Sequence, residues 1–479
     1  MNSKEYEESF PLNNECGLTF EKDLPVYFAR APARLDVMGG IADYSQSRVL
    51  QMTLAAEVMV YTQKKKRTKK FETGYFEIIS DLKIKEEHDE RVQRRISKIP
   101  VHELLDSNSG KLFKYATLSN KLRAFDRWRA YILGPMLTFA LEHNVRLTKR
   151  DNFIIYVCST IPEGKGVSSS AALEVASCAS FFSLLGFSQE EFEKWRLIPF
   201  YSFAAENLLV RAPCGIMDQM ACFYGRAYYL TPLTCSLPPL IGKSIEVPKF
   251  CVYGIDSTLK HQNTEGEYSK VRAAAFMGRT IIQQEHLVNF NFKSLCCLNR
   301  KFCNSNELHS FLENLLPEAM KGEDFLEIYG HDHGDLLTAP IKKEVFYPIR
   351  PSTMHALHED VRVREFEKIL KGEVTELEAQ TLGGLMSDSH LSYSRCSMGS
   401  KATDLLVELL NEIAYGSRIS GGGCGGLVVS LIRNTPEASS ALLNLLIKFA
   451  QQLGISEGDV HFLSGSSGGT YTSATQIIY

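Results

Sequence analysis

The stretch from Ile161 to Ala176, which reads IPEGKGVSSSAALEVA, constrains the fold more than any other part of the chain. It follows the apolar, strand-like stretch Phe153–Cys158 and continues into residues with the apolar spacing of a helix. A strand, a loop rich in glycine and serine, and a helix start bring unpaired backbone N–H groups and the positive end of the helix dipole to one place. The segment therefore predicts an anion-binding loop in a fold that mixes strands and helices.

The residues of this loop suit a phosphate group. Gly164 and Gly166 let the backbone approach a ligand closely, and serine hydroxyls can bind phosphate or a magnesium ion. The serines concerned are Ser168, Ser169 and Ser170. The loop is not a Walker A motif, because Lys165 is followed by glycine instead of serine or threonine and the GxxxxGK spacing fails.

Two further segments combine glycines with charged residues. The stretch Arg418–Ile432 holds GGGCGG before a strand-like run, and its glycines satisfy the GxGxxG spacing. A dinucleotide fold is not favoured, because these glycines precede a strand instead of opening a helix and too little chain follows. The stretch Ala31–Tyr44 places an arginine and two aspartates beside paired glycines, and we expect it to form a loop after the strand-like Val26–Arg30.

Composition excludes several classes of protein. The 479 residues are 44% hydrophobic and 23% charged, which is typical of a globular chain with two to four domains. A formal net charge of −3 gives no basic field for nucleic acid, and no apolar run is long enough for a membrane span. The polar, acidic start is unlike a signal or transit peptide, and 12 scattered cysteines indicate reduced thiols. We therefore expect a cytoplasmic protein that binds neither nucleic acid nor membrane.

Prolines and turn residues in the stretch Leu237–Lys249 mark the expected domain division. We predict one domain over residues 1–237 and a second over residues 238–479. Two stretches rich in histidine and acidic residues, 330–335 and 355–360, invite comparison with a metal site. Their spacings match no standard zinc pattern, and we predict a polar surface loop instead.

Taken in order, the three segments resemble the signature motifs of the GHMP small-molecule kinases, most closely those of the galactokinase branch. Within that branch, RLDVMGGIADYSQSRVLQM and APCGIMDQMACFYG are most similar to the kinase domain of L-arabinokinases. The resemblance implies an α+β, two-domain GHMP kinase fold with the active site between the domains. The N-terminal α/β domain would resemble ribosomal protein S5 domain 2, and the C-terminal domain would be ferredoxin-like.

The resemblance also implies the roles of the reacting groups. The stretch Pro213–Gln219 matches the family segment that holds the catalytic aspartate, here Asp218. Asp218 would act as a base or orienting acceptor at the anomeric hydroxyl of a sugar, and Arg34 beside it would stabilise the charge that develops. Ser170 and Glu206 would be the ligands of Mg²⁺.

Further residues are implied to bind ATP and the sugar. The loop Gly164–Ser170 would wrap the triphosphate of ATP. The glycines expected to pack beside that loop are Gly421, Gly422 and Gly423. The residues expected on the sugar side are Gly40, Asp43, Gly215 and Tyr268.

The choice of sugar depends on Gly40 and Ile41, which stand where a galactokinase has Glu-His. In that family the glutamate helps to hold the exocyclic C6 hydroxyl. A site without this acceptor suits a pentose, and L-arabinose has the ring configuration of D-galactose without C6. We therefore expect an L-arabinose 1-kinase that binds ATP and a small-molecule sugar as a monomer or weak homodimer.

Three alternatives to this function stand beside it. The first is a galactokinase that acts on D-galactose. The second is a catalytically silent regulatory protein that binds sugar and ATP, although the serine loop, Arg34 and Asp218 are all complete. The third is a uronic-acid kinase, which would need a basic residue where the chain has Gly40 and Ile41.

Overall fold

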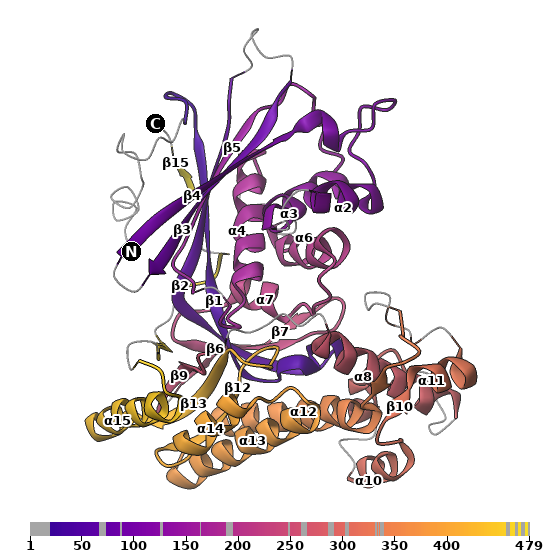
Figure 1. Ribbon diagram of the computed structural model, residues 1–479, viewed down its shortest axis with the longest axis vertical. Coiled ribbons are helices and arrows are strands. Elements are labelled where there is room, and N and C mark those ends of the chain that lie inside the picture. The colour runs from indigo at the N-terminus through magenta and orange to yellow at the C-terminus, as the bar shows by residue number, and fades with distance from the viewer. Residues whose placement is uncertain are drawn as a thin grey trace.

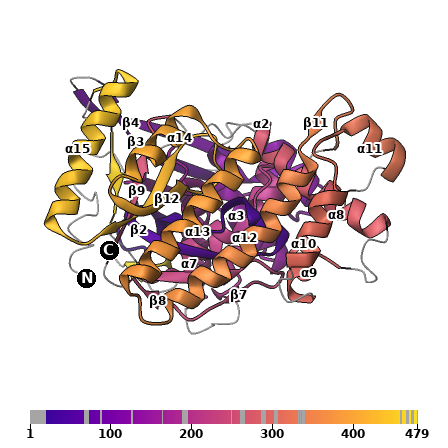
Figure 2. The same ribbon diagram turned by 90° about the horizontal axis from the view of Figure 1, so that it is seen from below.

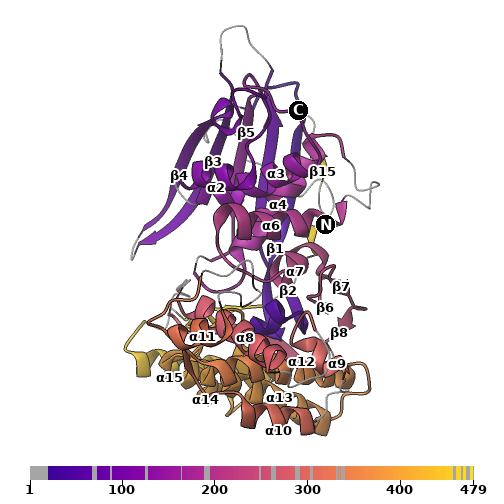
Figure 3. The same cartoon turned by 90° about the vertical axis from the view of Figure 1, so that its right-hand side faces the viewer.

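The computed structural model describes residues 20–477 except 67–72, 87–88, 125–127, 163, 188–194, 248–249, 260–265, 286–291, 302–305, 331–332, 334, 336–339, 457–459, 465–467 and 471–474. A large sheet with helices on one face forms the upper part of the molecule (Figure 1). A smaller sheet and a layer of long helices form the lower part, as Figure 3 shows from the side.

The large sheet of the described chain has nine strands. They follow the order β15-β1-β2-β5-β3-β4, with β6 beside β2 and with β7 and β8 beside β6. Their bounds are β1 (Val26–Met38), β2 (Arg48–Lys64), β3 (Tyr75–Glu86), β4 (Asp89–Pro100), β5 (Phe153–Ser159), β6 (Tyr229–Thr234), β7 (Leu240–Ile241), β8 (Ile245–Glu246) and β15 (Thr475–Ile477).

Helices cover one face of this sheet. The segment α4 (Ser169–Leu184) crosses β1 and β2 closely, because its buried face consists largely of alanine, serine and valine. Its outer side meets α3 (Trp128–Glu142) and α6 (Ile198–Ala205), which form a second helical layer (Figure 1). The other elements of this part are the 3₁₀ segments η2 (Gly40–Ser45) and η3 (Val101–Leu104), the helices α2 (Tyr115–Ala124) and α7 (Met217–Tyr224), and the π-helical segment η4 (Glu206–Val210).

The lower part contains a four-stranded antiparallel sheet in the order β12-β13-β9-β14. Its strands are β9 (Phe250–Asp256), β12 (Ala414–Ile419), β13 (Leu427–Arg433) and β14 (Phe462–Leu463). Helices connect β9 to β12 and β13 to β14, which gives the split βαβ arrangement of a ferredoxin-like domain. The predicted fold class is confirmed by this topology and by the fold comparisons reported below.

Long helices run side by side below the smaller sheet (Figure 2). The helices of this part are α8 (Glu267–Gln284), α9 (Cys296–Lys301), α10 (Asn306–Leu315), α11 (Gly322–Tyr329), α12 (Ile349–Leu370), α13 (Glu376–Arg395), α14 (Lys401–Leu410) and α15 (Pro436–Leu453). A short pair of strands, β10 (Met320–Lys321) and β11 (Phe346–Tyr347), lies beside them. None of the described helices is both long and apolar enough to cross a membrane.

The strand pairing bears on where the domains divide. The strands β7 and β8 follow residue 237, yet both pair with β6 of the large sheet. Near the end of the chain, β15 returns to pair with β1. The division between residues 237 and 238 stays a prediction, and these pairings favour a position after Glu246.

The ten described cysteines are free thiols.

Candidate active site

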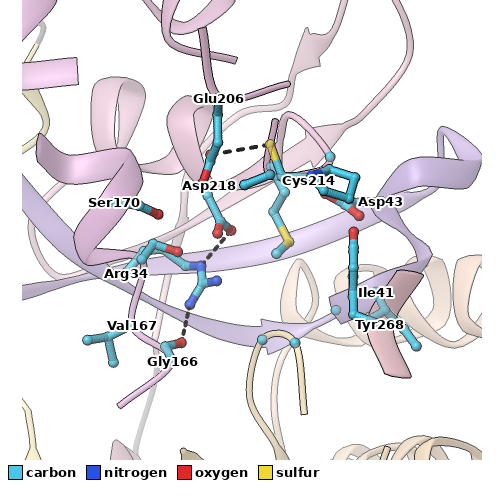
Figure 4. Close-up of a pocket in the computed structure, with 18 of the residues that line it drawn as sticks. Arg34, Ile41, Asp43, Gly166, Val167, Ser170, Glu206, Cys214, Asp218 and Tyr268 are labelled. Atoms are coloured by element: carbon cyan, nitrogen blue, oxygen red, sulfur yellow. Dashed lines mark hydrogen bonds and ion pairs between the residues drawn. The ribbon is translucent and has the colours of Figure 1, made fainter. Parts of the chain in front are cut away.

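A pocket lies between the large sheet and the lower helices, and it brings together nearly all of the predicted site residues (Figure 4). The predicted residues that line it are Arg34, Gly40, Asp43, Gly164, Gly166, Ser168, Ser169, Ser170, Glu206, Gly215, Asp218, Tyr268, Gly421 and Gly422. Gly423 is the predicted residue that does not line it, because its α-carbon packs against Met398 instead. Five stretches far apart in sequence therefore converge on one site.

The expected loop at Ala31–Tyr44 is wrong in its first half. The segment Val26–Met38 is one continuous strand, β1, and the irregular backbone begins only at Gly39. Charged residues in the strand suggested a loop, but every residue from Ala31 to Met38 is buried. Buried partners neutralise those charges, and a sequence pattern does not show such partners. Arg34 therefore projects from a rigid element.

Arg34 and Asp218 face each other at the centre of the pocket (Figure 4). Nε of Arg34 donates to Oδ1 of Asp218 at 2.8 Å, and Nη1 donates to the carbonyl oxygen of Gly166 at 2.9 Å. Burial alone would lower the pKa of Arg34, but the Asp218 carboxylate raises it above its ordinary value. The guanidinium therefore remains a cation that ties the carboxylate of α7 to the phosphate loop.

The loop Gly164–Ser170 has the geometry of an anion site. Gly164, Gly166 and Ser168 all have positive φ angles, of 72°, 71° and 61°, which turn the chain tightly into α4. The Ser168 hydroxyl caps no backbone group of α4 and is buried with no hydrogen-bond partner in the described part of the chain. The start of this long helix therefore presents donors toward the pocket.

Gly421, in the glycine loop before β13, packs against the phosphate loop. A Cβ at Gly421 would lie 3.0 Å from the carbonyl oxygen of Gly166 and 3.2 Å from Nη2 of Arg34. The φ angle of Gly421 is +68°, which favours glycine independently. On the other side of the phosphate loop, Lys165 forms an ion pair with Asp256 at the end of β9. Both contacts join the phosphate loop to the smaller sheet.

A cluster of carboxyl groups lies beside Ser170. Burial raises the pKa of Glu206 to about 7, and the nearby Asp218 carboxylate adds to the effect, while hydrogen bonds from Cys214, Ser170 and Gln219 oppose it. Behind it, burial and the Glu206 carboxylate raise the pKa of Glu174. The Gln219 side-chain amide donates to both, at 2.7 Å to Glu206 and 3.2 Å to Glu174.

These oxygens fit a hard divalent cation. Glu206 is a buried carboxylate in hydrogen-bond contact with the Ser170 hydroxyl, and no cation of the described chain forms an ion pair with it. Magnesium is bound through few protein oxygens, with phosphate and water completing its shell. Among the described residues, no group of three or more His, Cys, Asp or Glu side chains could hold a metal by itself.

Asp43 forms the opposite end of the pocket. Burial raises its pKa to about 7, with a further contribution from Asp218 and an opposing one from Arg272. Within the described chain its Oδ1 is buried without a hydrogen-bond partner. Gly215 allows this placement, because a Cβ there would lie 1.7 Å from Oδ2 of Asp43. A buried, unsatisfied carboxylate oxygen at a pocket wall is suited to accept from ligand hydroxyls.

A network of buried charged side chains lies behind the pocket, and the sequence motifs did not indicate that these residues contact one another. Nη1 of Arg418 donates to Oδ2 of Asp36 at 3.0 Å, and both side chains are 0% exposed. Asp36 in turn accepts from the backbone N–H groups of Gly40 and Gly421. Glu359 accepts from the N–H of Gly39. The network thus fixes the backbone of both loops at once.

The prediction of a polar surface loop is wrong for 355–360, which lies within α12. In the stretch 330–335, His333 and Asp335 lie outside helices and strands as predicted but are buried, and residues 331, 332 and 334 are outside the described part of the chain. Glu359 lies buried on α12, where burial opposes ionisation but Arg418 and Arg362 lower its pKa to about 2. Asp335 is buried and accepts two hydrogen bonds from Arg272, at 2.7 and 3.1 Å. Arg418 and Arg272 are distant in sequence from these acids and help to stabilise them in the interior, which spacing alone could not indicate.

Several lining residues were not singled out from the sequence. They are Val167, Ala212, Pro213, Cys214, Met217 and Ser269. The sequence could have indicated Cys214, because it lies inside the stretch Pro213–Gln219; its thiol donates to Glu206 at 3.3 Å. The sequence could also have indicated Arg272, because it follows Tyr268 by four residues and therefore lies on the same face of a helix.

Comparison with known proteins finds similarity to sugar kinases and to a kinase family model. The family model "GHMP kinases N terminal domain" matches residues 131–226. L-arabinokinase from Arabidopsis thaliana is 31% identical over 92% of this chain, and the chain spans 46% of that protein's length. Galactokinase from Streptomyces coelicolor is 28% identical over 64% of this chain and 66% of its own length.

Solved structures agree on the fold. Lactococcus lactis galactokinase, in complex with galactose, has a TM-score of 0.66 and 17% identity, with 99% of this chain and 98% of the other covered. Methanococcus jannaschii mevalonate kinase has a TM-score of 0.51 and 13% identity, with 92% and 98% covered. At these identities the likeness concerns the fold alone.

Proposed function

We propose that this chain is an ATP-dependent sugar 1-kinase of the GHMP kinase family and that its substrate is L-arabinose. It would transfer the γ-phosphoryl group of MgATP to the anomeric hydroxyl, which gives L-arabinose 1-phosphate and ADP. The observation that carries the proposal is the Arg34–Asp218 pair, which lies between the phosphate loop and the Asp43 wall. A hydroxyl bound between these two ends would meet a carboxylate on one side and a triphosphate on the other.

Asp218 is the residue proposed to touch the reacting hydroxyl. Its side chain is 27% exposed, so one carboxylate edge reaches the pocket while Oδ1 accepts from Arg34. In this role Asp218 accepts the proton of the anomeric hydroxyl, or orients that hydroxyl toward the γ-phosphorus. Arg34 places positive charge where the transferred group becomes more negative, and its bond to Gly166 keeps it fixed.

ATP and Mg²⁺ are the proposed cosubstrate and cofactor. The N–H groups at the start of α4 and the Ser168 hydroxyl would bind the phosphates, and Ser170 and Glu206 would hold the metal. When bound, Mg²⁺ neutralises charge on the β- and γ-phosphates. The carboxylate of Glu206 must then be ionised, and Gln219 and Cys214 are placed to hold it in position.

The choice of a pentose is supported by the wall at Gly40 and Ile41. Both residues line the pocket, and neither has a side chain that can accept a hydroxyl hydrogen. Asp43, 5% exposed, is left to accept from ring hydroxyls. A hexose would bring a further polar group to this wall with no partner there, which costs binding relative to a pentose.

Steady-state kinetics with ATP tests this assignment directly. We expect kcat/KM for L-arabinose to exceed that for D-galactose, with phosphorus NMR identifying the anomeric phosphate of the product. A preference for D-galactose would replace the pentose assignment with the runner-up, a galactokinase. Binding of sugar and ATP without any turnover would instead favour a regulatory sugar sensor and overturn the kinase assignment.

A further inference from the structure

The space beside Gly40 is not empty, although the residue has no side chain. A Cβ built at Gly40 would lie 1.5 Å from the hydroxyl oxygen of Tyr393 and 2.6 Å from its Cζ. Such a contact is far inside the van der Waals limit, and the backbone at Gly40 also has a φ of +48°. The phenol of Tyr393, on α13, therefore occupies the volume where a side chain at position 40 would begin.

Tyr393 is held from several sides and cannot easily give way. Its hydroxyl accepts from the N–H of Ile41 at 2.8 Å and donates to the carbonyl oxygen of Gly421 at 2.9 Å. The ring stands edge-on to His355, with centroids 5.0 Å apart, and the Arg418 guanidinium lies 5.0 Å from the ring centroid. The side chain is 0% exposed.

The hydroxyl of Tyr393 also has no hydrogen left to donate to a ligand. Its one hydrogen is donated to Gly421, and it accepts from the backbone that carries Gly40 and Ile41. The wall at Gly40 is thus backed by a group that is held on both sides by hydrogen bonds to the backbone. A wall of this kind restricts the size of a ligand, in addition to lacking an acceptor.

We propose that Tyr393 is a specificity-determining residue, which backs the Gly40 wall so closely that the sugar site admits a pentose and sterically excludes an exocyclic carbon. The inference rests on the proposed function, in which the exocyclic end of the sugar faces Gly40. The inference goes beyond the proposed function because it assigns the choice between sugars to the side chain that fills the volume behind Gly40. That side chain comes from α13, a helix of the lower part of the molecule. Tyr393 touches neither the sugar nor the nucleotide and acts through the backbone of residues 40 and 41.

A substrate comparison on the unaltered protein separates steric exclusion from the mere lack of an acceptor. The 6-deoxy analogue of D-galactose, D-fucose, carries the exocyclic carbon but no hydroxyl on it. Steric exclusion predicts that kcat/KM for D-fucose falls below that for L-arabinose by about tenfold or more, as it does for D-galactose. If D-fucose is phosphorylated nearly as well as L-arabinose, the wall does not exclude the carbon and the inference is overturned.

Variants of the pair then test Tyr393 itself. We expect Gly40→Glu alone to lose turnover of every sugar, because the new side chain collides with a fixed ring. Tyr393→Leu removes the ring and should raise the ratio of kcat/KM for D-galactose over L-arabinose by about tenfold. The double variant Gly40→Glu with Tyr393→Leu should restore turnover relative to Gly40→Glu and raise this ratio further, since the carboxylate can accept from the added hydroxyl.

Tyr393→Phe is the matched control. It removes the hydroxyl and its two hydrogen bonds, but Cζ still lies 2.6 Å from a Cβ at position 40. We expect it to lower kcat for both sugars and to leave their ratio unchanged. Thermal melts and ATP binding check that each variant folds.

The two proposals fail in different ways. If the unaltered chain phosphorylates no sugar, the proposed function fails before the variants are made. If it phosphorylates L-arabinose but the Tyr393→Leu and double variants keep the original ratio of the two sugars, only the role of Tyr393 is wrong. A change of ratio in Tyr393→Phe would move the effect from volume to hydrogen bonding and would also overturn the inference.

Discussion

The two ends of the pocket are built in different ways. The phosphate end is built around one continuous segment, Gly164–Ser170, whose turn conformations and helix start lie within seven residues of one another. The sugar end is assembled from η2, the Gly215 loop and α8, and it is backed by α12, α13 and β12. The phosphate end therefore depends on local backbone geometry, whereas the sugar end depends on contacts between distant segments. Substitutions can test whether the two ends respond as separately as this difference implies.

Asp218 lies between the ends, and its removal should have the largest effect. We expect Asp218→Asn to lower kcat by about 10³-fold, because an amide can neither take a proton nor pair with the Arg34 cation. Binding of ATP at the phosphate end should change little. Rapid-quench kinetics and ATP titration measure the two quantities separately.

A matched control for this variant is Asp388→Asn, on the exposed side of α13. It should leave kcat unchanged. Near-normal turnover in Asp218→Asn would remove the aspartate from the reaction. A large loss of ATP affinity would show that the two ends are not separate at this residue.

The buried network behind the sugar end should dominate stability. We expect Arg418→Met to lower the free energy of unfolding by about 3–5 kcal/mol, because Asp36 and Glu359 would remain as buried charges without this cation. Arg433→Met, on β13, breaks an exposed ion pair with Glu376 at the start of α13 and should cost at most about 1 kcal/mol. Urea denaturation of the two variants provides the comparison. Equal losses would mean that the network holds neither loop.

A substitution at Gly215, whose backbone lies close to Asp43 at the sugar end, should have an intermediate effect on activity. A methyl group at Gly215 would overlap Asp43, so Gly215→Ala should displace that carboxylate and raise KM for the sugar by about tenfold. KM for ATP should stay within about twofold, which follows from the separation of the ends. Gly384→Ala is the control, because nothing lies within 4 Å of its Cβ position on α13. It should slightly stabilise the helix, by about 0.5–1 kcal/mol.

The same contrast explains what the sequence could and could not reveal. The phosphate loop and the strands at Phe153–Ser159 and Leu427–Arg433 were predictable, because periodicity and turn residues act over a few positions. Asp218 and Glu206 were predicted from the resemblance to a family. Both side chains line one pocket with Arg34.

The residues behind the sugar end could not be found in that way. Gly39 and Glu359 are 320 residues apart, and Ile41 and Tyr393 are 352 residues apart. An acid on a helix that includes histidines reads as polar surface until its arginine partner is known. For the same reason Gly40 suggested an open space, because a missing side chain does not reveal which other residue fills its volume.

The smallest expected difference between the two ends of the pocket concerns the protonation of one carboxyl group at each end. Glu206 at the phosphate end and Asp43 at the sugar end both have pKa values raised to about 7, from ordinary values of 4.5 and 3.8. At these two carboxyl groups the folded protein holds more protons than the unfolded chain between about pH 4 and 7. Their contribution to the free energy of unfolding therefore falls as pH rises through this window, and Glu206→Gln or Asp43→Asn should each remove one part of that decline.

Metal binding distinguishes these two carboxyl groups. A divalent cation at Glu206 favours the ionised form, so binding at pH 7 should release about half a proton and cost about 0.4 kcal/mol of affinity relative to high pH. Calorimetry of MgATP binding in two buffers of different ionisation enthalpy counts the released protons. Glu206→Gln should abolish the release, and Asp43→Asn should leave it intact, because Asp43 lies at the other end of the pocket. Loss of the release in Asp43→Asn would instead mean that the two carboxyl groups titrate together across Asp218, and the two ends would then be one electrostatic unit.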